Sequence, residues 1–250
     1  MLYPCRKEPT KARPWYNCRM GTRSVTFAPE EWFHCYTRGV DRRTIFLEER
    51  DYARFHMLLF SCNGTKPIHI SNLNKRAGPM LETVFQQDRG APLVDIGAYA
   101  LMPSHPHLLL RERDYGGISA FMQKLGTAYT MYFNKKYERS GSLFSSRFKA
   151  RHVNSDVYFR KVVNYIHANP AEIVESKWKE GVIRNEKRLK NFLLTYRFSS
   201  LPDYEGSSRL ESAIINRDGL LDVLDTIPTF AALLKDARVF YRQESEEMEA

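Results

Sequence analysis

Apolar side chains recur every three or four residues in three segments of the chain, 48–62, 116–137 and 155–168. This spacing places them along one face of a helix and predicts three amphipathic helices. Ser155 is suited to cap the third helix, because its hydroxyl can accept a hydrogen bond from the first turn. Pro170 would stop that helix shortly after its last apolar residue.

Segments rich in β-branched and aromatic residues lie between these helices and predict four strands, at 32–40, 93–102, 105–112 and 141–153. Only Pro103 and Ser104 separate the second strand from the third, which indicates a tight hairpin. The fourth strand is expected at the edge of a sheet. The resulting order, βαββαβα, predicts an α+β fold with an antiparallel sheet and helices on one face.

The rest of the chain has a weaker pattern. Residues 1–30 are basic and rich in proline, and we expect an irregular arm there. Residues 31–175 are expected to form the main domain, with an insertion at 63–92 that contains a short helix near Met80. Residues 176–250 form a mostly helical extension, and its last helical stretch is expected at 219–248.

The composition is that of an ordinary globular protein of 250 residues, 43% hydrophobic and 27% charged. It has no apolar run long enough for a membrane span and no signal peptide, so we expect a cytoplasmic protein. The four cysteines lie far apart without CxxC spacing, which favours reduced thiols over a zinc site.

The formal net charge is +9, which indicates a polyanionic partner and most often nucleic acid. Basic residues are dense between 124 and 152, where tyrosines and phenylalanines are interleaved with them. Cations can neutralise phosphates and aromatic rings can stack on bases. Several of these rings also follow helical spacing and are therefore expected in the core.

Two histidines lie close together in "YALMPSHPHLLL", residues 99–110. Side chains two apart share one face of a strand, so His105 and His107 can converge on one divalent cation. Pro106 lacks a backbone donor, which suggests that this part of the strand lies at an edge or after a bend. A pair of surface histidines with no metal is the alternative, and two histidines alone do not complete a metal site.

The third predicted helix can supply the missing ligand. Tyr165 and Asn169 are four residues apart and share a helix face. An asparagine oxygen suits Mg²⁺ or Mn²⁺, and a cation beside a tyrosine would favour its attack on a phosphate. Alternatively, Tyr165 is a core aromatic and Asn169 only ends the helix. His167 points away from both and is not expected to bind the metal.

Together, "YALMPSHPHLLL", "GSLFSSRFKARHVNSDVYFRKVVNYIHANP" and "FHCYTRGVDRRTIFLEERDYARF" resemble the single-tyrosine HUH transposases of the IS200-like family. The likeness is greatest to the REP-associated tyrosine transposases. It extends over about residues 25–175, with its three motifs in the order of the family. The family pattern "MPNHVH" is altered here, because Ser104 replaces asparagine and Pro106 replaces an aliphatic residue.

This resemblance implies a ferredoxin-like fold and a metal-dependent endonuclease and strand transferase that acts on single-stranded DNA flanked by hairpins. It implies Tyr165 as the nucleophile that forms a 5′-phosphotyrosine. The implied ligands of Mg²⁺ or Mn²⁺ are His105, His107 and Asn169. The candidate DNA contacts are the basic residues Arg38, Arg42, Arg43, Lys135, Lys136, Arg147, Lys149 and Arg151.

Three other functions stay open. The chain can be a relative that binds hairpin DNA but no longer cuts it. It can be an RNA-binding domain, although its aromatic residues do not follow the RNA-recognition pattern. It can be a replication initiator or relaxase with the same chemistry. The oligomeric state, monomer or homodimer, and the target sequence cannot be read from the chain.

Overall fold

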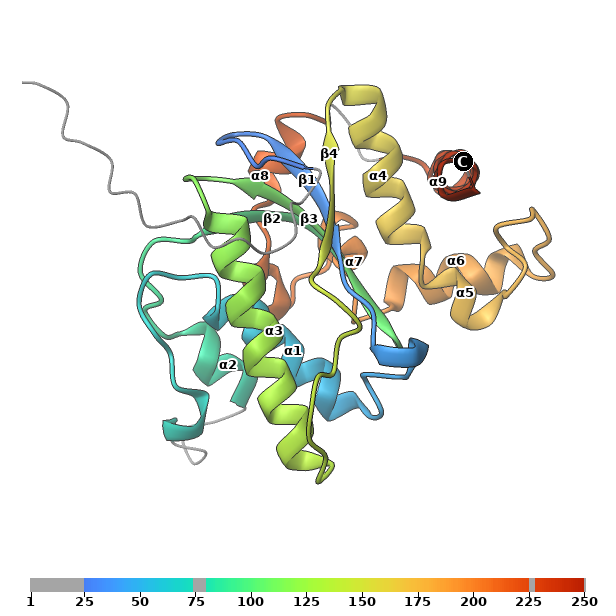
Figure 1. Ribbon diagram of the computed structural model, residues 1–250. Coiled ribbons are helices and arrows are strands. Elements are labelled where there is room, and N and C mark those ends of the chain that lie inside the picture. The colour runs from blue at the N-terminus through green and yellow to red at the C-terminus, as the bar shows by residue number, and fades with distance from the viewer. Residues whose placement is uncertain (1–24, 74–79, 225–227, 250) are drawn as a thin grey trace, which may run out of the picture.

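The computed structural model describes residues 25–73, 80–224 and 228–249 (Figure 1). Most of the predicted arm therefore lies outside the described residues. The helices and strands, with 3-10 helices marked η, are β1 (Trp32–Tyr36), η1 (Val40–Arg42), α1 (Glu49–Ser61), η2 (Ile70–Asn72), α2 (Met80–Phe85), β2 (Val94–Met102), β3 (His105–Glu112), α3 (Gly117–Lys136), β4 (Lys149–Val153), α4 (Asp156–Ala168), α5 (Ala171–Val174), α6 (Glu186–Thr195), α7 (Leu201–Tyr204), η3 (Leu210–Ile214), α8 (Arg217–Leu221) and α9 (Phe230–Glu249).

The strands form one antiparallel sheet in the order β2-β3-β1-β4. With α1 and α3 between them, they have the predicted βαββαβ order and the ferredoxin-like arrangement. Met102 pairs with His105 across the two-residue turn between β2 and β3, as the sequence predicts. β4 lies at the sheet edge, also as predicted.

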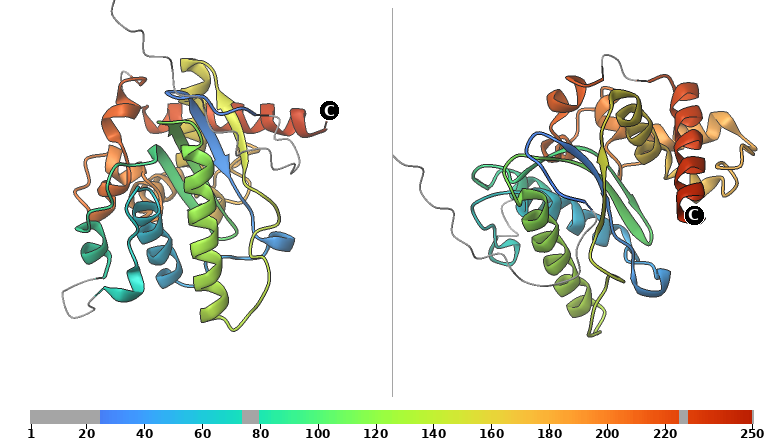
Figure 2. Two further views of the ribbon diagram at one scale, coloured as in Figure 1. Left: turned by 60° about the vertical axis from the view of Figure 1, so that its left-hand side comes forward. Right: turned by 45° about the horizontal axis from the view of Figure 1, so that its top comes forward.

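The fourth strand is shorter than the sequence predicts, because it begins at Lys149 rather than at residue 141. Residues 141–148 are held by isolated backbone hydrogen bonds and not by continuous strand pairing. Ser145 N–H donates to the carbonyl of Arg38, and Val40 N–H donates to that of Leu143. This segment therefore leaves the sheet and runs beside α3 (Figures 1 and 2).

Helices cover both faces of the sheet, which corrects the prediction of helices on one face (Figure 2). α1 and α3 pack on one face, and α4, α8 and α9 contribute to the cluster on the other. The physical reason lies in the central strands. Leu108, Leu109 and Leu110 are consecutive and all fully buried, so apolar side chains on both faces of β3 need covering.

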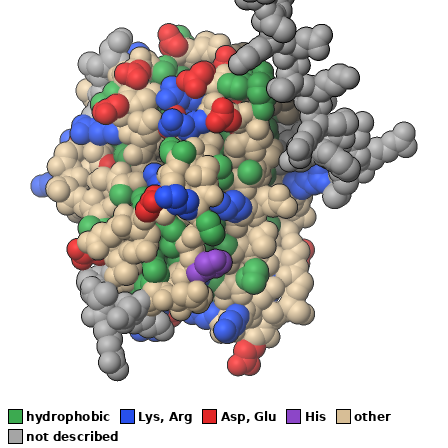
Figure 3. All heavy atoms as spheres, turned by 90° about the vertical axis from the view of Figure 1, so that its left-hand side faces the viewer, with side chains coloured by type: hydrophobic (Ala, Val, Ile, Leu, Met, Phe, Trp, Pro, Cys, Tyr) green, Lys and Arg blue, Asp and Glu red, His purple; other side chains and the backbone are tan. Residues whose placement is uncertain are grey.

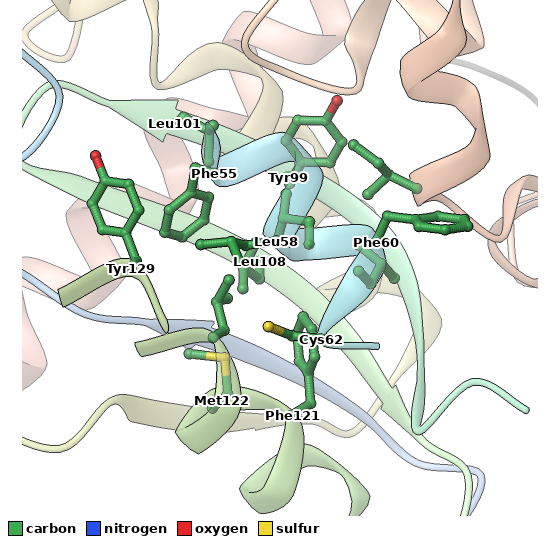
Figure 4. Close-up of a cluster of buried hydrophobic side chains, with 14 of the residues drawn as sticks. Phe55, Leu58, Phe60, Cys62, Tyr99, Leu101, Leu108, Phe121, Met122 and Tyr129 are labelled. Carbon is green, nitrogen blue, oxygen red and sulfur yellow. The ribbon is translucent and has the colours of Figure 1, made fainter. Parts of the chain in front are cut away.

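The larger core lies between the sheet and helices α1 and α3 (Figure 4). Phe55 from α1, Leu108 from β3 and Phe121 from α3 meet there and are almost fully buried. Tyr129 is buried in the same core, and its hydroxyl donates to the carbonyl of Ile45 over 2.5 Å. As expected from the helical spacing, this ring between the basic residues belongs to the core.

The C-terminal extension packs onto the main domain. Ser200 N–H donates to the carbonyl of Tyr99 on β2, and Tyr204 hydrogen-bonds to the carbonyl of Gly97. α9 lies along α4, where its Phe240 is 1% exposed. The predicted helical stretch 219–248 is divided between α8 and α9. The extension thus completes the second face of the sheet.

Along the described part of the chain, no helix has the length and apolar character needed to cross a membrane. Cys35 and Cys62 are buried and form no disulfide among the described residues, and the reduced state of the thiols stays a prediction. The other two cysteines lie outside the described residues. On the face shown in Figure 3, Lys and Arg side chains are interspersed with Asp and Glu side chains.

Candidate active site

The paired histidines lie at the start of β3 and face α4. His105 and His107 have ring centroids 4.8 Å apart, so the two imidazoles share one face of the strand as predicted. Pro106 between them points toward the opposite face. Leu101 is paired with Pro106, but its N–H donates to the carbonyl of Phe198.

In an antiparallel strand, each residue directs its own N–H and C=O groups toward the same neighbouring strand. Leu101 directs its N–H away from β3, so its pair with Pro106 is one without hydrogen bonds. On the other side of β3, pairing with β1 ends at Tyr36 and His107. Proline therefore removes no hydrogen bond from either ladder. β3 is a central strand, so Pro106 takes the second of its two expected positions, just after the turn that joins β2 to β3.

Each histidine has one ring nitrogen engaged within the protein. The Nδ1 atom of His105 lies 2.9 Å from Oγ of Ser104. The Nδ1 atom of His107 lies 3.0 Å from Nε2 of His34, a buried residue of β1. These contacts leave the two Nε2 atoms for a ligand, and Nε2 of His107 is buried without a partner among the described residues.

α4 brings the tyrosine to these histidines. Ser155 caps the helix as predicted, by accepting a hydrogen bond from Tyr158 N–H over 3.3 Å. One face of the helix carries Phe159, Val162 and Ile166 into the core, and this packing fixes how the helix is rotated.

Tyr165 lies edge-on to the ring of His107, with 5.5 Å between the two ring centroids. Its ring centroid lies 5.9 Å from the ring centroid of His34. Phe240 of α9 contacts the tyrosine ring from 4.5 Å. The strand histidines and the helix tyrosine therefore meet, as the sequence analysis requires.

Asn169 follows α4 directly and is 1% exposed. Its side-chain amide donates to the carbonyl of Tyr165 over 3.2 Å, while its Oδ1 atom is buried with no hydrogen-bond partner among the described residues. His167 hydrogen-bonds to Ser200 through Nε2 and is a satisfied core histidine. The expectation that it points away from the candidate ligands is confirmed.

These donor atoms fit a divalent cation. A buried imidazole nitrogen and a buried amide oxygen without partners are two atoms that a cation would satisfy. Side-chain groups of His, Cys, Asp and Glu alone form no cluster of three or more able to hold a metal in the described residues. A site on His105 and His107 would therefore need a further ligand of another kind, and the amide oxygen of Asn169 is the candidate.

Burial keeps the histidines neutral. It lowers the pKa of His105 to about 3, and the nearby charges of Arg38 and Lys179 act in the same direction. Burial and the neighbouring His105 and His34 lower the pKa of His107 well below 6.5. Neutral imidazoles keep a lone pair for a cation.

The basic residues around the site differ in accessibility. Arg151 is half-buried on β4, and its charge contributes to lowering the pKa of His34. The remaining candidates, apart from Lys136, are exposed and stay predicted DNA contacts: Arg38, Arg42, Arg43, Lys135, Arg147 and Lys149.

Lys136 does not fit its predicted role as a DNA contact. Its ammonium group pairs with Asp51 at 2.5 Å and with Glu48 at 2.6 Å. Asp51 is fully buried and also accepts hydrogen bonds from the hydroxyls of Tyr132 and Tyr137. The lysine therefore neutralises a buried carboxylate between α1 and α3, which a basic run in the sequence does not reveal.

Three further residues at the site were not found from the sequence. His34 supports His107, and Phe240 covers Tyr165. Lys179 forms an ion pair with Glu172 at 2.6 Å and lies 4.7 Å from the ring centroid of Tyr241. His34 lies in a predicted strand, but only the pairing of β1 with β3 places it beside His107.

Residues 53–169 match the model of a family described as "Transposase IS200 like". The matched segment includes both strand histidines, Tyr165 and Asn169, and it confirms the resemblance drawn from the motifs. No curated protein matches the chain. A solved structure described as "Structure of the REP associates tyrosine transposase bound to a REP hairpin" is similar, with 13% identity and a TM-score of 0.43 over 77% of this chain and 90% of that chain.

Proposed function

We propose, on the premise that residues 53–169 match the model of the IS200-like transposases, that this protein cleaves and rejoins single-stranded DNA through a covalent bond to Tyr165. The contact between Tyr165 and His107 is the observation that carries the proposal, because it joins the candidate nucleophile to the candidate metal ligands. These residues lie far apart in the sequence and come together only in the fold.

His105, His107 and Asn169 would hold a divalent cation such as Mg²⁺ or Mn²⁺. When bound, the cation would polarise a phosphate oxygen and orient the bond to be broken. The two histidines supply neutral nitrogens, and Asn169 supplies an oxygen at the end of the helix that carries the tyrosine. Because Asn169 also hydrogen-bonds to the carbonyl of Tyr165, ligand and nucleophile are held in one turn of chain.

In the proposed step, the Tyr165 hydroxyl oxygen attacks a DNA phosphorus atom and loses its proton to solvent. The bond from phosphorus to the 3′ oxygen breaks, and that oxygen takes up a proton to become a free 3′-hydroxyl. The downstream strand remains attached as a 5′-phosphotyrosine. Attack by another 3′-hydroxyl reverses the step and joins new ends, with no nucleotide cofactor.

Hairpin DNA with single-stranded flanks is the proposed partner. The chain is strongly basic, and the exposed Arg38, whose charge acts on His105, suits a contact with a phosphate. The similar solved protein is described as bound to a REP hairpin. A protein that binds such hairpins without cutting them is the alternative, and the experiment below separates the two.

The experiment follows a covalent adduct between protein and DNA. Hairpin oligonucleotides with single-stranded flanks, taken from the DNA around the gene, carry a fluorophore at the 3′ end, since the downstream strand stays on the protein. With Mg²⁺ or Mn²⁺, the wild type is expected to give a labelled band at the size of the protein on a denaturing gel. EDTA is expected to remove that band.

Tyr165→Phe is expected to lower adduct formation on the order of 10³-fold or more, because it removes the attacking oxygen and keeps the ring. Hairpin affinity should stay within about twofold. Tyr158→Phe is the matched control on the same helix and should form the adduct normally. Cleavage by the Tyr165 variant at the wild-type rate would refute the nucleophile, whereas hairpin binding without any adduct would support the non-cutting alternative.

A further inference from the structure

A groove of about 880 Å³ lies on the other face of the sheet from the candidate active site. One wall is α3, and the other is the irregular segment 142–148 that runs beside it (Figure 2). Phe55, Pro106 and Leu125 are among the apolar residues that line it. The volume is in the range of cavities that bind small organic molecules.

The α3 wall is a row of polar groups. Ser119, Gln123 and Thr127 follow one another at intervals of four residues and therefore lie on one face of the helix, with Thr130 continuing the row. Hydroxyl and amide groups in this arrangement can donate to and accept from the edges of nucleobases.

The opposite wall combines aromatic and basic groups. Phe144 and Phe148 are half-buried, and Phe148 is held by stacking on Phe27 with 6.1 Å between the centroids. Arg147 lies between them in the sequence and is exposed, with Lys149 following. Aromatic rings and a cation on one wall suit the alternating bases and phosphates of a single strand.

Gly126 leaves the α3 wall open to a ligand at the middle of the helix. It lies in the middle of α3, where glycine is less stable than alanine because it gives the unfolded chain more freedom. A Cβ atom at this position would meet nothing within 4 Å. The fold itself therefore does not require glycine here, whereas close approach of a ligand to the helix backbone would.

The groove and the histidines are connected through one strand. Pro106 lines the groove, and its neighbours His105 and His107 point to the opposite face of β3. Thr37, which follows β1, lies beside Pro106 at the same end of the sheet. A strand of DNA that passes over this end can therefore contact both surfaces.

We propose that this groove binds unpaired nucleotides of the DNA strand whose phosphate reaches Tyr165. Bases insert between α3 and Phe144 or Phe148, and Arg147 neutralises a phosphate. This inference rests on the proposed function, but it concerns binding rather than cleavage. It makes the groove a determinant of which single-stranded flank the protein accepts.

The test fills the groove without weakening the fold. Gly126→Ala and Gly126→Leu put side chains into the open space and also favour the helix, so both variants should unfold at a higher urea concentration than the wild type. Binding of a labelled hairpin with a single-stranded flank, measured by fluorescence anisotropy, should weaken about threefold for alanine and more than tenfold for leucine. Binding of the same hairpin without a flank should stay unchanged.

Ala120→Leu is the matched control, because residue 120 is exposed on α3 and does not line the groove. It should leave flank binding unchanged. Arg147→Gln provides a second measurement: it should weaken binding of the flanked hairpin and lower the slope of log affinity against log salt by about 1.

Wild-type affinity of Gly126→Leu for the flanked hairpin would overturn the groove proposal. So would a change of oligomeric state in the groove variants without a loss of DNA binding, since the groove would then be an interface between two copies. Either result leaves the Tyr165 adduct untouched. Conversely, the absence of an adduct with the wild type would refute cleavage while the anisotropy data still decide the groove.

Discussion

At the level of single residues, the contact between His34 and His107 decides which nitrogen can bind a cation. One of the two facing nitrogens must carry the proton that joins them. If His107 donates from Nδ1, its Nε2 atom has a lone pair for a metal. If His34 donates instead, Nε2 of His107 carries a proton and cannot bind one. Metal binding therefore requires His34 to be the acceptor.

His34→Phe should lower the affinity of the protein for Mn²⁺ about 10–100-fold, because His107 loses the partner that fixes its tautomer. His34→Gln should recover part of this loss, since its side-chain oxygen can accept from Nδ1. Titration of the EDTA-treated protein with Mn²⁺, followed by electron paramagnetic resonance without DNA, measures both. Equal Mn²⁺ affinity in the wild type and His34→Phe would exclude the positioning role.

The sequence predicts the residues of the site where the relation is local. His105 and His107 alternate along one strand, and Tyr165 and Asn169 are one helical turn apart, so each pair follows from backbone periodicity. The support from His34 depends on strand pairing between positions 73 residues apart. No local pattern encodes such a contact.

At the level of elements, α9 packs along α4 and contributes an aromatic side chain to the site. Its Phe240 contacts Tyr165 and also lies 5.7 Å from the ring centroid of Tyr158, so the helix holds α4 through aromatic contacts. Phe240 is 1% exposed, and removing its ring would leave a cavity against Tyr165. The C-terminal extension is therefore part of the framework that positions the nucleophile.

Phe240→Ala should lower the free energy of unfolding by roughly 3–5 kcal/mol, as for other large aromatic side chains removed from a core. Urea unfolding followed by circular dichroism measures the change. Arg242→Ala is the control on the same helix, where the side chain is exposed, and it should stay within about 0.5 kcal/mol of the wild type. A similar small loss for Phe240→Ala would mean that α9 does not stabilise α4.

The ends of elements were predicted less well than their order. Residues 141–148 have strand-like side chains, yet they form isolated contacts with the chain after β1 and leave the ladder to β4. Their conformation depends on how α3 and the 38–40 turn are placed. Likewise, Lys136 was predicted to bind DNA because only the fold shows that Asp51 is buried beside it.

At the level of the whole molecule, the burial of several histidines makes the stability of the fold depend on pH. His56 on α1 is 1% exposed and packs against Tyr99 and Phe198. Burial lowers its pKa to about 3, with further lowering from Arg209 and Arg197. Its Nδ1 atom lies 3.9 Å from Glu211, a separation at which a protonated His56 could form an ion pair.

The sign of the pH dependence follows from this depressed pKa. Below pH 6.5 the unfolded chain takes up a proton at His56 while the folded protein does not, so unfolding is favoured. The stability from this residue is complete above pH 6.5 and is lost as the pH falls toward 3. Each pH unit costs about 1.4 kcal/mol, or roughly 2 kcal/mol between pH 6.5 and 5.

His56→Gln should therefore lose less stability than the wild type on going from pH 7.5 to 5, by up to roughly 2 kcal/mol in urea unfolding. Glu211, Arg197 and Arg209 face this position in both proteins, so their own titration largely cancels in the comparison. His69→Gln is the matched control, because it replaces a histidine whose side chain is exposed. An identical loss in His56→Gln and the wild type would contradict the lowered pKa of His56 in the folded protein.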